Sequence, residues 1–100
     1  MVISKINESG KITLILEGVL DTTTAPQLQE VLIPAFDEAM HITMDFSKLD
    51  YVSSAGLRVL LIGQKTANAK GASMAVSKVP DGIKEVFEIT GFSDMLTIID

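Results

Sequence analysis

The stretch MDFSKLDYVSSAGLRVLL, from Met44 to Leu61, decides the fold because its spacing changes from strand-like to helical. Its beginning belongs to an alternating run, His41 to Phe46, with apolar side chains on one face, as in a strand that buries one side. Its end carries apolar residues three and four positions apart, as in an amphipathic helix. We therefore predict a strand, a connection over residues 47–50, and a helix that begins at Ser53 or Ser54.

This helix is predicted to run to about Lys70 and to stop at Gly71, a residue suited to a left-handed terminal conformation. Its first turns are apolar nearly all round. Such a segment is either buried on both sides or presents an apolar face to a partner, with Arg58 and Lys65 as a polar rim. The expected core stripe contains Leu57, Leu60 and Leu61, and the residues expected off this stripe are Val59, Ile62 and Gly63.

Upstream, the pattern predicts a hairpin. Two alternating runs, Val2 to Ile6 and Lys11 to Glu17, flank the turn-rich residues 7–10. Gly18 is expected to end the second strand, because glycine weakens strand interiors.

A second amphipathic helix should follow this hairpin. Thr24, with Gln27 three residues later, fits a capping box at its start. Pro34 lies inside its apolar stripe, where proline removes a backbone donor and clashes with the preceding turn. We therefore expect a kink or break near Ile33.

The C-terminal part continues the alternation of strands and helices. It predicts a strand at Ser73–Val79, a helix capped by Asp81 and stopped by Gly91, and a closing strand at Leu96–Ile99. The element order is strand–strand–helix–strand–helix–strand–helix–strand. It predicts one α/β domain over residues 1–100, with a mixed, mostly parallel sheet of about five strands and three main helices.

Composition excludes several classes of function. The 100 residues carry 13 acidic and 8 basic side chains, a net charge of −5, without a Lys/Arg cluster, so nucleic acid and anionic membranes are poor partners. No cysteine occurs, which excludes disulfides and thiolate metal sites, and Asp21, Asp45 and Asp50 come from separate elements without a metal-ligand spacing. The start has no signal-peptide pattern, and no apolar stretch is long enough to cross a bilayer, so we expect a cytoplasmic location without membrane insertion.

The paired serines at the helix start have three interpretations: a helix cap, a catalytic nucleophile, or a site for another protein's chemistry. The surrounding Val-Ser-Ser-Ala-Gly is not a Gly-x-Ser-x-Gly elbow. The only histidine, His41, is expected at the far end of the preceding strand, roughly 17 Å away, whereas a base must lie within about 3 Å of its hydroxyl. Two interpretations of the serines remain, a helix cap and a phosphate acceptor. Serine is a preferred N-cap residue, and the free N–H groups and the helix dipole favour an anion at a helix start.

Two landmarks give the chain a family resemblance. MDFSKLDYVSSAGLRVLL, Met44 to Leu61, resembles the signature of the STAS domain of anti-sigma factor antagonists, in which a strand leads into Asp-Ser-Ser-Gly-Leu at a helix start. LEGVLDTTTAPQLQEVL, Leu16 to Leu32, resembles the second landmark of that family, Gly-x-Leu-Asp followed by a capped helix. The resemblance covers essentially the whole chain.

The resemblance implies a non-enzymatic partner-switching regulator without a cofactor. In the family, the dephosphorylated form binds an anti-sigma factor, usually a serine kinase of the GHKL ATPase type, and a PP2C-like phosphatase reverses phosphorylation. The phosphoserine of the family falls on Ser54, while Ser53 replaces its aspartate and Ala55 its next serine, which makes Ser53 a second candidate acceptor. The implied partner surface contains Asp21, Thr22, Thr23, Ser53, Ser54, Gly56, Leu57, Arg58 and Ile62.

Two alternatives stay open beside this switch. STAS-like domains also serve as constitutive subunits of larger assemblies, such as lipid-transport complexes, and Ser53 in place of the aspartate is consistent with that role. A small-ligand or nucleotide sensor is the weaker alternative, because no Gly-rich phosphate loop is visible. Phosphorylation of Ser54 by a cognate kinase distinguishes the switch from the constitutive subunit.

Overall fold

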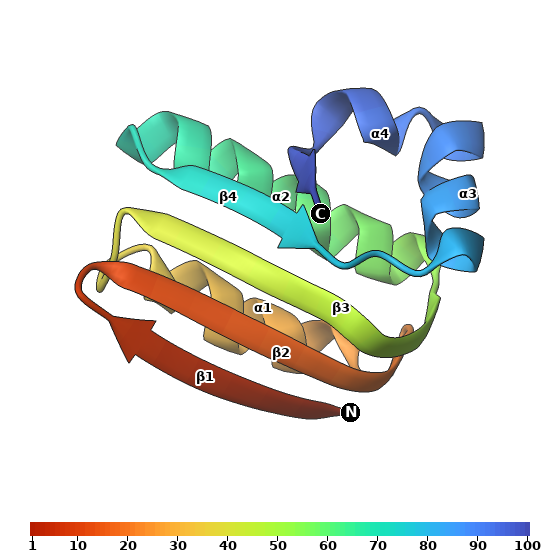
Figure 1. The fold of residues 1–100 in the computed structure, drawn as a ribbon, viewed down its shortest axis with the longest axis horizontal. Coiled ribbons are helices and arrows are strands. Elements are labelled where there is room, and N and C mark those ends of the chain that lie inside the picture. The colour runs from red at the N-terminus through yellow and green to blue at the C-terminus, as the bar shows by residue number, and fades with distance from the viewer.

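A five-stranded sheet in the order β1-β2-β3-β4-β5 is the framework of the computed structural model, which describes residues 1–100 (Figure 1). β1 is antiparallel to β2, and the other neighbours are parallel, so the predicted mixed, mostly parallel sheet is confirmed. The strands are β1 (Val2–Glu8), β2 (Lys11–Leu20), β3 (His41–Val52), β4 (Ser73–Ser77) and β5 (Ile98–Ile99).

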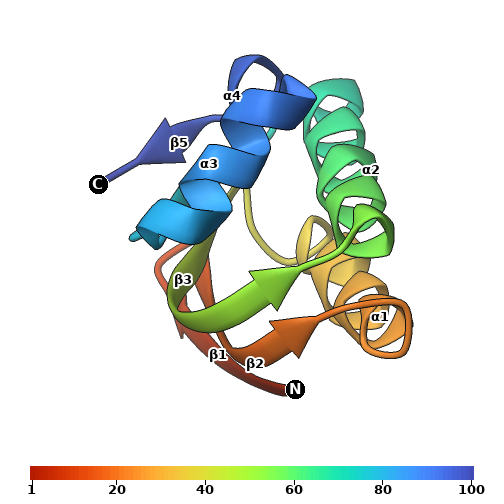
Figure 2. The same ribbon diagram turned by 90° about the vertical axis from the view of Figure 1, so that its right-hand side faces the viewer.

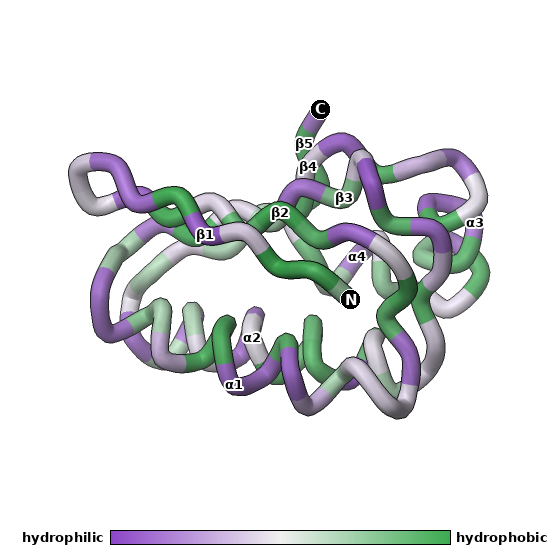
Figure 3. Tube along the Cα trace, turned by 90° about the horizontal axis from the view of Figure 1, so that it is seen from below, coloured by the Kyte–Doolittle hydropathy of each residue, from purple (hydrophilic) through white to green (hydrophobic).

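Helices cover one face of the sheet. α1 (Ala25–Ala35) and α2 (Ser54–Lys70) lie side by side on this face, and α3 (Asp81–Thr90) with the short α4 (Phe92–Met95) lies beyond the end of β4 (Figures 1 and 2). The opposite face of the sheet carries no helix (Figure 3). None of the helices combines the length and apolar character needed to span a membrane.

The core lies between the sheet and the helices. The alternation expected for β3 is confirmed, since Ile42, Met44 and Phe46 are all buried. Phe46 packs against Phe87 of α3, with ring centroids 6.3 Å apart. The other buried residues contributed by β2, β4, α1 and α2 include Ile12, Leu14, Leu16, Met74, Val76, Leu28, Leu32 and Leu60.

The ends of α2 agree with the prediction. Ser53 is its N-cap and Gly71 its left-handed C-cap, at φ 66°. Its expected core stripe is corrected, because Val59 and Gly63 are buried whereas Leu61 is only half-buried. Gly56 and Gly63 face the core, where a Cβ would lie 2.7 Å from Leu20 Cγ and from Leu32 Cδ2, respectively, so the α2 backbone approaches β2 and α1 closely.

β2 and β3 are both longer than predicted. Gly18 does not end β2, which continues to Leu20, and residues 47–50 belong to β3 rather than to a connection. The β2–β3 register shifts between Ile15 and Glu17 and again between Gly18 and Val19. These irregularities break the period-two pattern without ending the strands, so alternation alone placed their ends too early.

Several predicted helix and strand ends are also corrected. α1 ends at Ala35, two residues after the break expected near Ile33, and Pro34 lies in its last turn. Asp81 is the first residue of α3 rather than its cap, and its side chain makes no capping bond. β4 ends at Ser77, before Lys78 with its positive φ of 54°. The closing strand is limited to Ile98–Ile99, because α4 extends to Met95, and Leu96 and Thr97 connect it to the strand.

Candidate functional site

The ends of β2 and β3 bring the two sequence landmarks together. Leu20 pairs with Val52 in the parallel ladder, and the Ser53 backbone N–H donates to the Leu20 carbonyl oxygen at 2.8 Å. Asp21 follows Leu20 directly, so the turn before α1 lies beside the start of α2. Figure 2 shows both strands leading in the same direction into these turns.

Asp21 organises the turn before α1. Its Oδ1 accepts hydrogen bonds from the backbone N–H groups of Thr23 at 2.9 Å and Thr24 at 3.1 Å, and Thr24 Oγ1 in return accepts from the Asp21 N–H at 2.8 Å. This reciprocal cap replaces the expected pair of Thr24 and Gln27, which is wrong because Gln27 Nε2 donates to the Met1 carbonyl oxygen. The hydrogen bonds from Thr24 and Thr23 hold the pKa of Asp21 below its ordinary value. Asp21 is therefore an ionised group at this end of the sheet.

The two serines have different environments. Ser53 is half-buried, and its Oγ accepts from the Gly56 N–H at 3.3 Å. Ser54 is the first residue of α2, and its exposed hydroxyl makes no hydrogen bond within the chain. The cap is thus supplied by Ser53, which leaves the Ser54 hydroxyl free.

Replacing Ser53 by Ala should lower the free energy of unfolding by about 1 kcal/mol, because α2 loses its cap. Ser54→Ala is the matched control and should leave it nearly unchanged. Urea unfolding of both variants measures the difference, and equal losses would contradict this division of roles.

The remaining residues of the implied partner surface fall into two groups. Gly56 and Leu57 are buried, so they support the surface from below. A Cβ at Gly56 would lie 2.7 Å from Leu20 Cγ and 2.9 Å from Val52 Cγ2, which explains why the start of α2 needs glycine. Thr22, Thr23 and Arg58 are exposed, and Ile62 is half-buried.

Two exposed apolar residues near this predicted surface were missed from the sequence. Val19 and Tyr51 are paired across β2 and β3, with 38% and 54% of their surfaces exposed. They lie two residues before Asp21 and Ser53 in the chain and add exposed apolar area at the strand ends. They were missed because both strands were expected to end before them.

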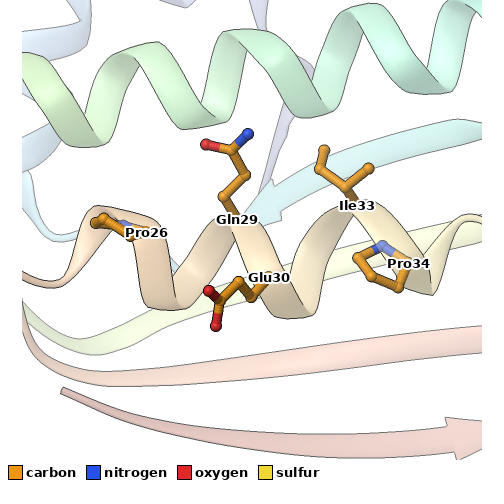
Figure 4. Close-up of a pocket in the computed structure, with 5 residues that line it drawn as sticks. All are labelled: Pro26, Gln29, Glu30, Ile33 and Pro34. Carbon is orange, nitrogen blue, oxygen red and sulfur yellow. The ribbon is translucent and has the colours of Figure 1, made fainter.

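Other predicted candidates lie away from this surface or do not form a site. His41 is exposed at the opposite end of β3, as expected, with Nδ1 2.6 Å from Ser73 Oγ. No cluster of His, Asp and Glu capable of holding a metal occurs. A shallow hollow lies on α1, where Figure 4 shows the side chains diverging around the helix; it is lined by Pro26, Gln29, Glu30, Ile33 and Pro34.

Asp45 is a second ionised carboxylate, on the helix-free face of the sheet. Burial raises its pKa, but the hydrogen bonds from Ser47, including N–H to Oδ1 at 2.8 Å, and the charge of Lys78, with Nζ 3.6 Å from Oδ2, outweigh burial and lower it. Asp45 therefore stabilises the end of β4 rather than forming part of the serine surface.

The lowered pKa values of Asp21 and Asp45 predict acid sensitivity. Each carboxylate stabilises the fold above the pKa of the unfolded chain, about 3.9, and this contribution is lost as the pH falls through the lower pKa of the folded chain. The free energy of unfolding should therefore decline below about pH 4. Urea titrations from neutral to acidic pH test this, and Asp45→Asn should show a shallower decline; identical slopes would contradict the role of Asp45.

Comparison with known proteins identifies the family. Residues 5–98 match the family model described as "Mlab, STAS domain". The chain belongs to the STAS domain family. A Bordetella bronchiseptica protein provisionally named as the anti-sigma factor antagonist BtrV is 32% identical over 90 residues, covering 89% of this chain and 78% of that protein. The anti-sigma-B factor antagonist of Staphylococcus aureus is 33% identical over 82 residues, covering 81% and 76%.

Solved STAS structures share the fold. The anti-sigma factor antagonist SpoIIAA in its unphosphorylated form superposes with a TM-score of 0.78 at 17% identity, covering 99% of this chain and 88% of SpoIIAA. The phosphorylated form of SpoIIAA, from Bacillus, gives 0.76 at 16% identity, covering 99% and 92%. These structures show the same fold, and the curated relatives of 32% and 33% identity make the chain a member of the anti-sigma factor antagonist family, which implies an anti-sigma factor as the kind of partner.

Proposed function

We propose that this STAS domain binds an anti-sigma factor through the ends of β2 and β3 and the start of α2, and thereby releases a sigma factor. Phosphorylation of Ser54 ends this binding. The anti-sigma factor is a serine kinase of the GHKL ATPase type, and a PP2C-like phosphatase restores the binding form. The observation that carries the proposal is the exposed, unbonded Ser54 hydroxyl beside the Asp21 turn.

The fold is expected to tolerate a phosphate on Ser54. The residue lies in the first turn of α2, where free N–H groups and the helix dipole favour negative charge. Arg58 lies one turn further on the same outward face, and its exposed guanidinium takes part in no salt bridge. The modification therefore changes the surface without unfolding the helix.

The same phosphate is expected to oppose partner binding. It adds about −1.5 to −2 charges at neutral pH, beside the ionised Asp21 and on a chain whose net charge is already −5. At an interface that excludes water, an unpaired neutral polar group already costs about 2–7 kcal/mol, and an unpaired charged group such as this phosphate costs more.

A constitutive STAS subunit is the second candidate. Ser53 favours it, because the family has an aspartate at this position. The matching family model, described as "Mlab, STAS domain", is not described as an anti-sigma factor antagonist either. Such a subunit would bind its partner without any response to kinase and ATP.

Binding to the GHKL-type serine kinases of the source genome tests the proposed surface. Isothermal titration without ATP should find one kinase that binds the unmodified chain. Thr23→Arg should weaken this binding at least about tenfold, because it places a long charged side chain on the surface. The matched control Thr97→Arg lies at an exposed position next to β5 and should bind normally. Absence of binding to every kinase, or equal effects of the two substitutions, would contradict the proposal.

A further inference from the structure

The outer edge of β1 has no neighbouring strand. β1 is the first strand of the sheet and spans Val2 to Glu8, and Figure 1 shows no element beyond it. Its ladder with β2 is unbroken from Val2 opposite Glu17 to Glu8 opposite Lys11. In an antiparallel ladder, alternate residues direct their N–H and C=O groups away from the partner, so the outer edge offers unpaired groups to another strand.

This edge lacks the usual protection against pairing. β1 contains no proline and no register shift, and the Gln27 side chain fixes the preceding residue, Met1, through its carbonyl oxygen. The Lys5 ammonium is 2.6 Å from Glu38 Oε2, so its charge is already paired. The edge is therefore regular, seven residues long, and without a free central charge.

β1 also exposes apolar side chains on the helix-free face. Val2 and Ile6 are paired with Glu17 and Thr13 across the ladder and are 58% and 43% exposed. Lys5 is paired with the buried Leu14 and therefore lies on the helix-covered face.

The sequence of β1 is self-complementary in one register. We propose that a second copy of this chain pairs with β1 in an antiparallel manner about a twofold axis at Ser4, joining the two sheets. Val2 then lies opposite Ile6 of the other copy, and Ile3 lies opposite Lys5. Centring on Ile3 or Ile6 would not place Val2 opposite Ile6, and centring on Lys5 would oppose two lysines. A shift by one residue would place side chains on the wrong faces.

The dimer is weak and leaves the Ser54 surface open. Pairing of a few residues is smaller than a standard interface of about 1,600 Å², so association depends on concentration. Ser54 follows β3, and β2 lies between β3 and the paired edge. The inference is independent of the proposed function.

Sedimentation equilibrium of the full chain from about 10 µM to 1 mM tests the proposal, because weak interfaces dissociate in this range. The wild type should shift from monomer toward dimer. Ser4→Lys and Ser4→Glu should each raise the dissociation constant about fivefold through like-charge opposition, and their equimolar mixture should regain association. Ser4 is exposed, so both variants are expected to fold, which circular dichroism checks.

Crosslinking measures the register. Ser4→Cys should form a disulfide dimer on mild oxidation, because directly paired residues have Cα atoms about 4.5–5.5 Å apart. Glu8→Cys is the control, since the two copies of Glu8 lie at opposite ends of the paired strands and should not crosslink. A monomer at every concentration, charge variants that associate like the wild type, or equal crosslinking at both positions would overturn the proposal.

Discussion

Phosphorylated at Ser54, the STAS domain is expected to bind its anti-sigma factor about 100-fold more weakly than the unmodified chain, a difference of about 2.7 kcal/mol. The Ser54 hydroxyl is exposed and unbonded, so the phosphate is held outward at the start of α2. There it adds its charge beside Asp21, whose carboxylate is kept ionised by the Thr23 and Thr24 N–H groups. Titration calorimetry with the unmodified and the singly phosphorylated chain measures the ratio.

Substitutions at Ser54 separate the effect of added negative charge on binding from the effect of losing the hydroxyl. Ser54→Asp carries a smaller charge than a phosphate and should weaken binding about tenfold, whereas Ser54→Ala should bind like the unmodified chain and ignore kinase and ATP. Ser53→Ala is the control for the cap and should still respond to the kinase. Equal binding of all three variants, with and without ATP, would contradict the switch.

Replacing Gly56 by Ala should lower the free energy of unfolding by about 1–3 kcal/mol, because the new methyl group overpacks the contact beneath the serines. Its Cβ would lie 2.7 Å from Leu20 Cγ and 2.9 Å from Val52 Cγ2, and both of these side chains are buried in the core. To relieve this overpacking, the start of α2 has to shift, so binding to the anti-sigma factor should weaken as well.

Gly82→Ala makes the same chemical change where space is free. Gly82 lies in the first turn of α3, and a Cβ there would meet nothing within 4 Å. This variant should raise the free energy of unfolding by about 0.5–1 kcal/mol, because alanine favours the helix and restricts the unfolded chain. Urea unfolding compares the two, and a change of the same sign in both would contradict the close contact at Gly56.

Features encoded by local residues could be predicted from the sequence. The ends of α2 were found because Ser53 and Gly71 have the chemistry that a cap and a left-handed stop require. The ends of β2 and β3 were not found, because register shifts depend on pairing between strands that the sequence of either strand does not show. Val19 and Tyr51 were missed for the same reason.

The site was predictable in part. Both landmarks were placed from the sequence, and the contact between them depends on the parallel register of Leu20 and Val52. The sequence offered two adjacent serines as candidate acceptors. The hydrogen bond from the Gly56 N–H to Ser53 Oγ, together with the greater exposure of Ser54, distinguishes the capping serine from the free one.

Phosphorylation of Ser54 is tested by intact-mass spectrometry with site mapping, after incubation of the chain with ATP and each GHKL-type serine kinase of the source genome. One added phosphate is expected on Ser54 in the wild type and in Ser53→Ala, and none in Ser54→Ala. A phosphate on Ser53, or no phosphate with a kinase that binds the folded chain, would contradict the switch at Ser54 and favour a constitutive subunit.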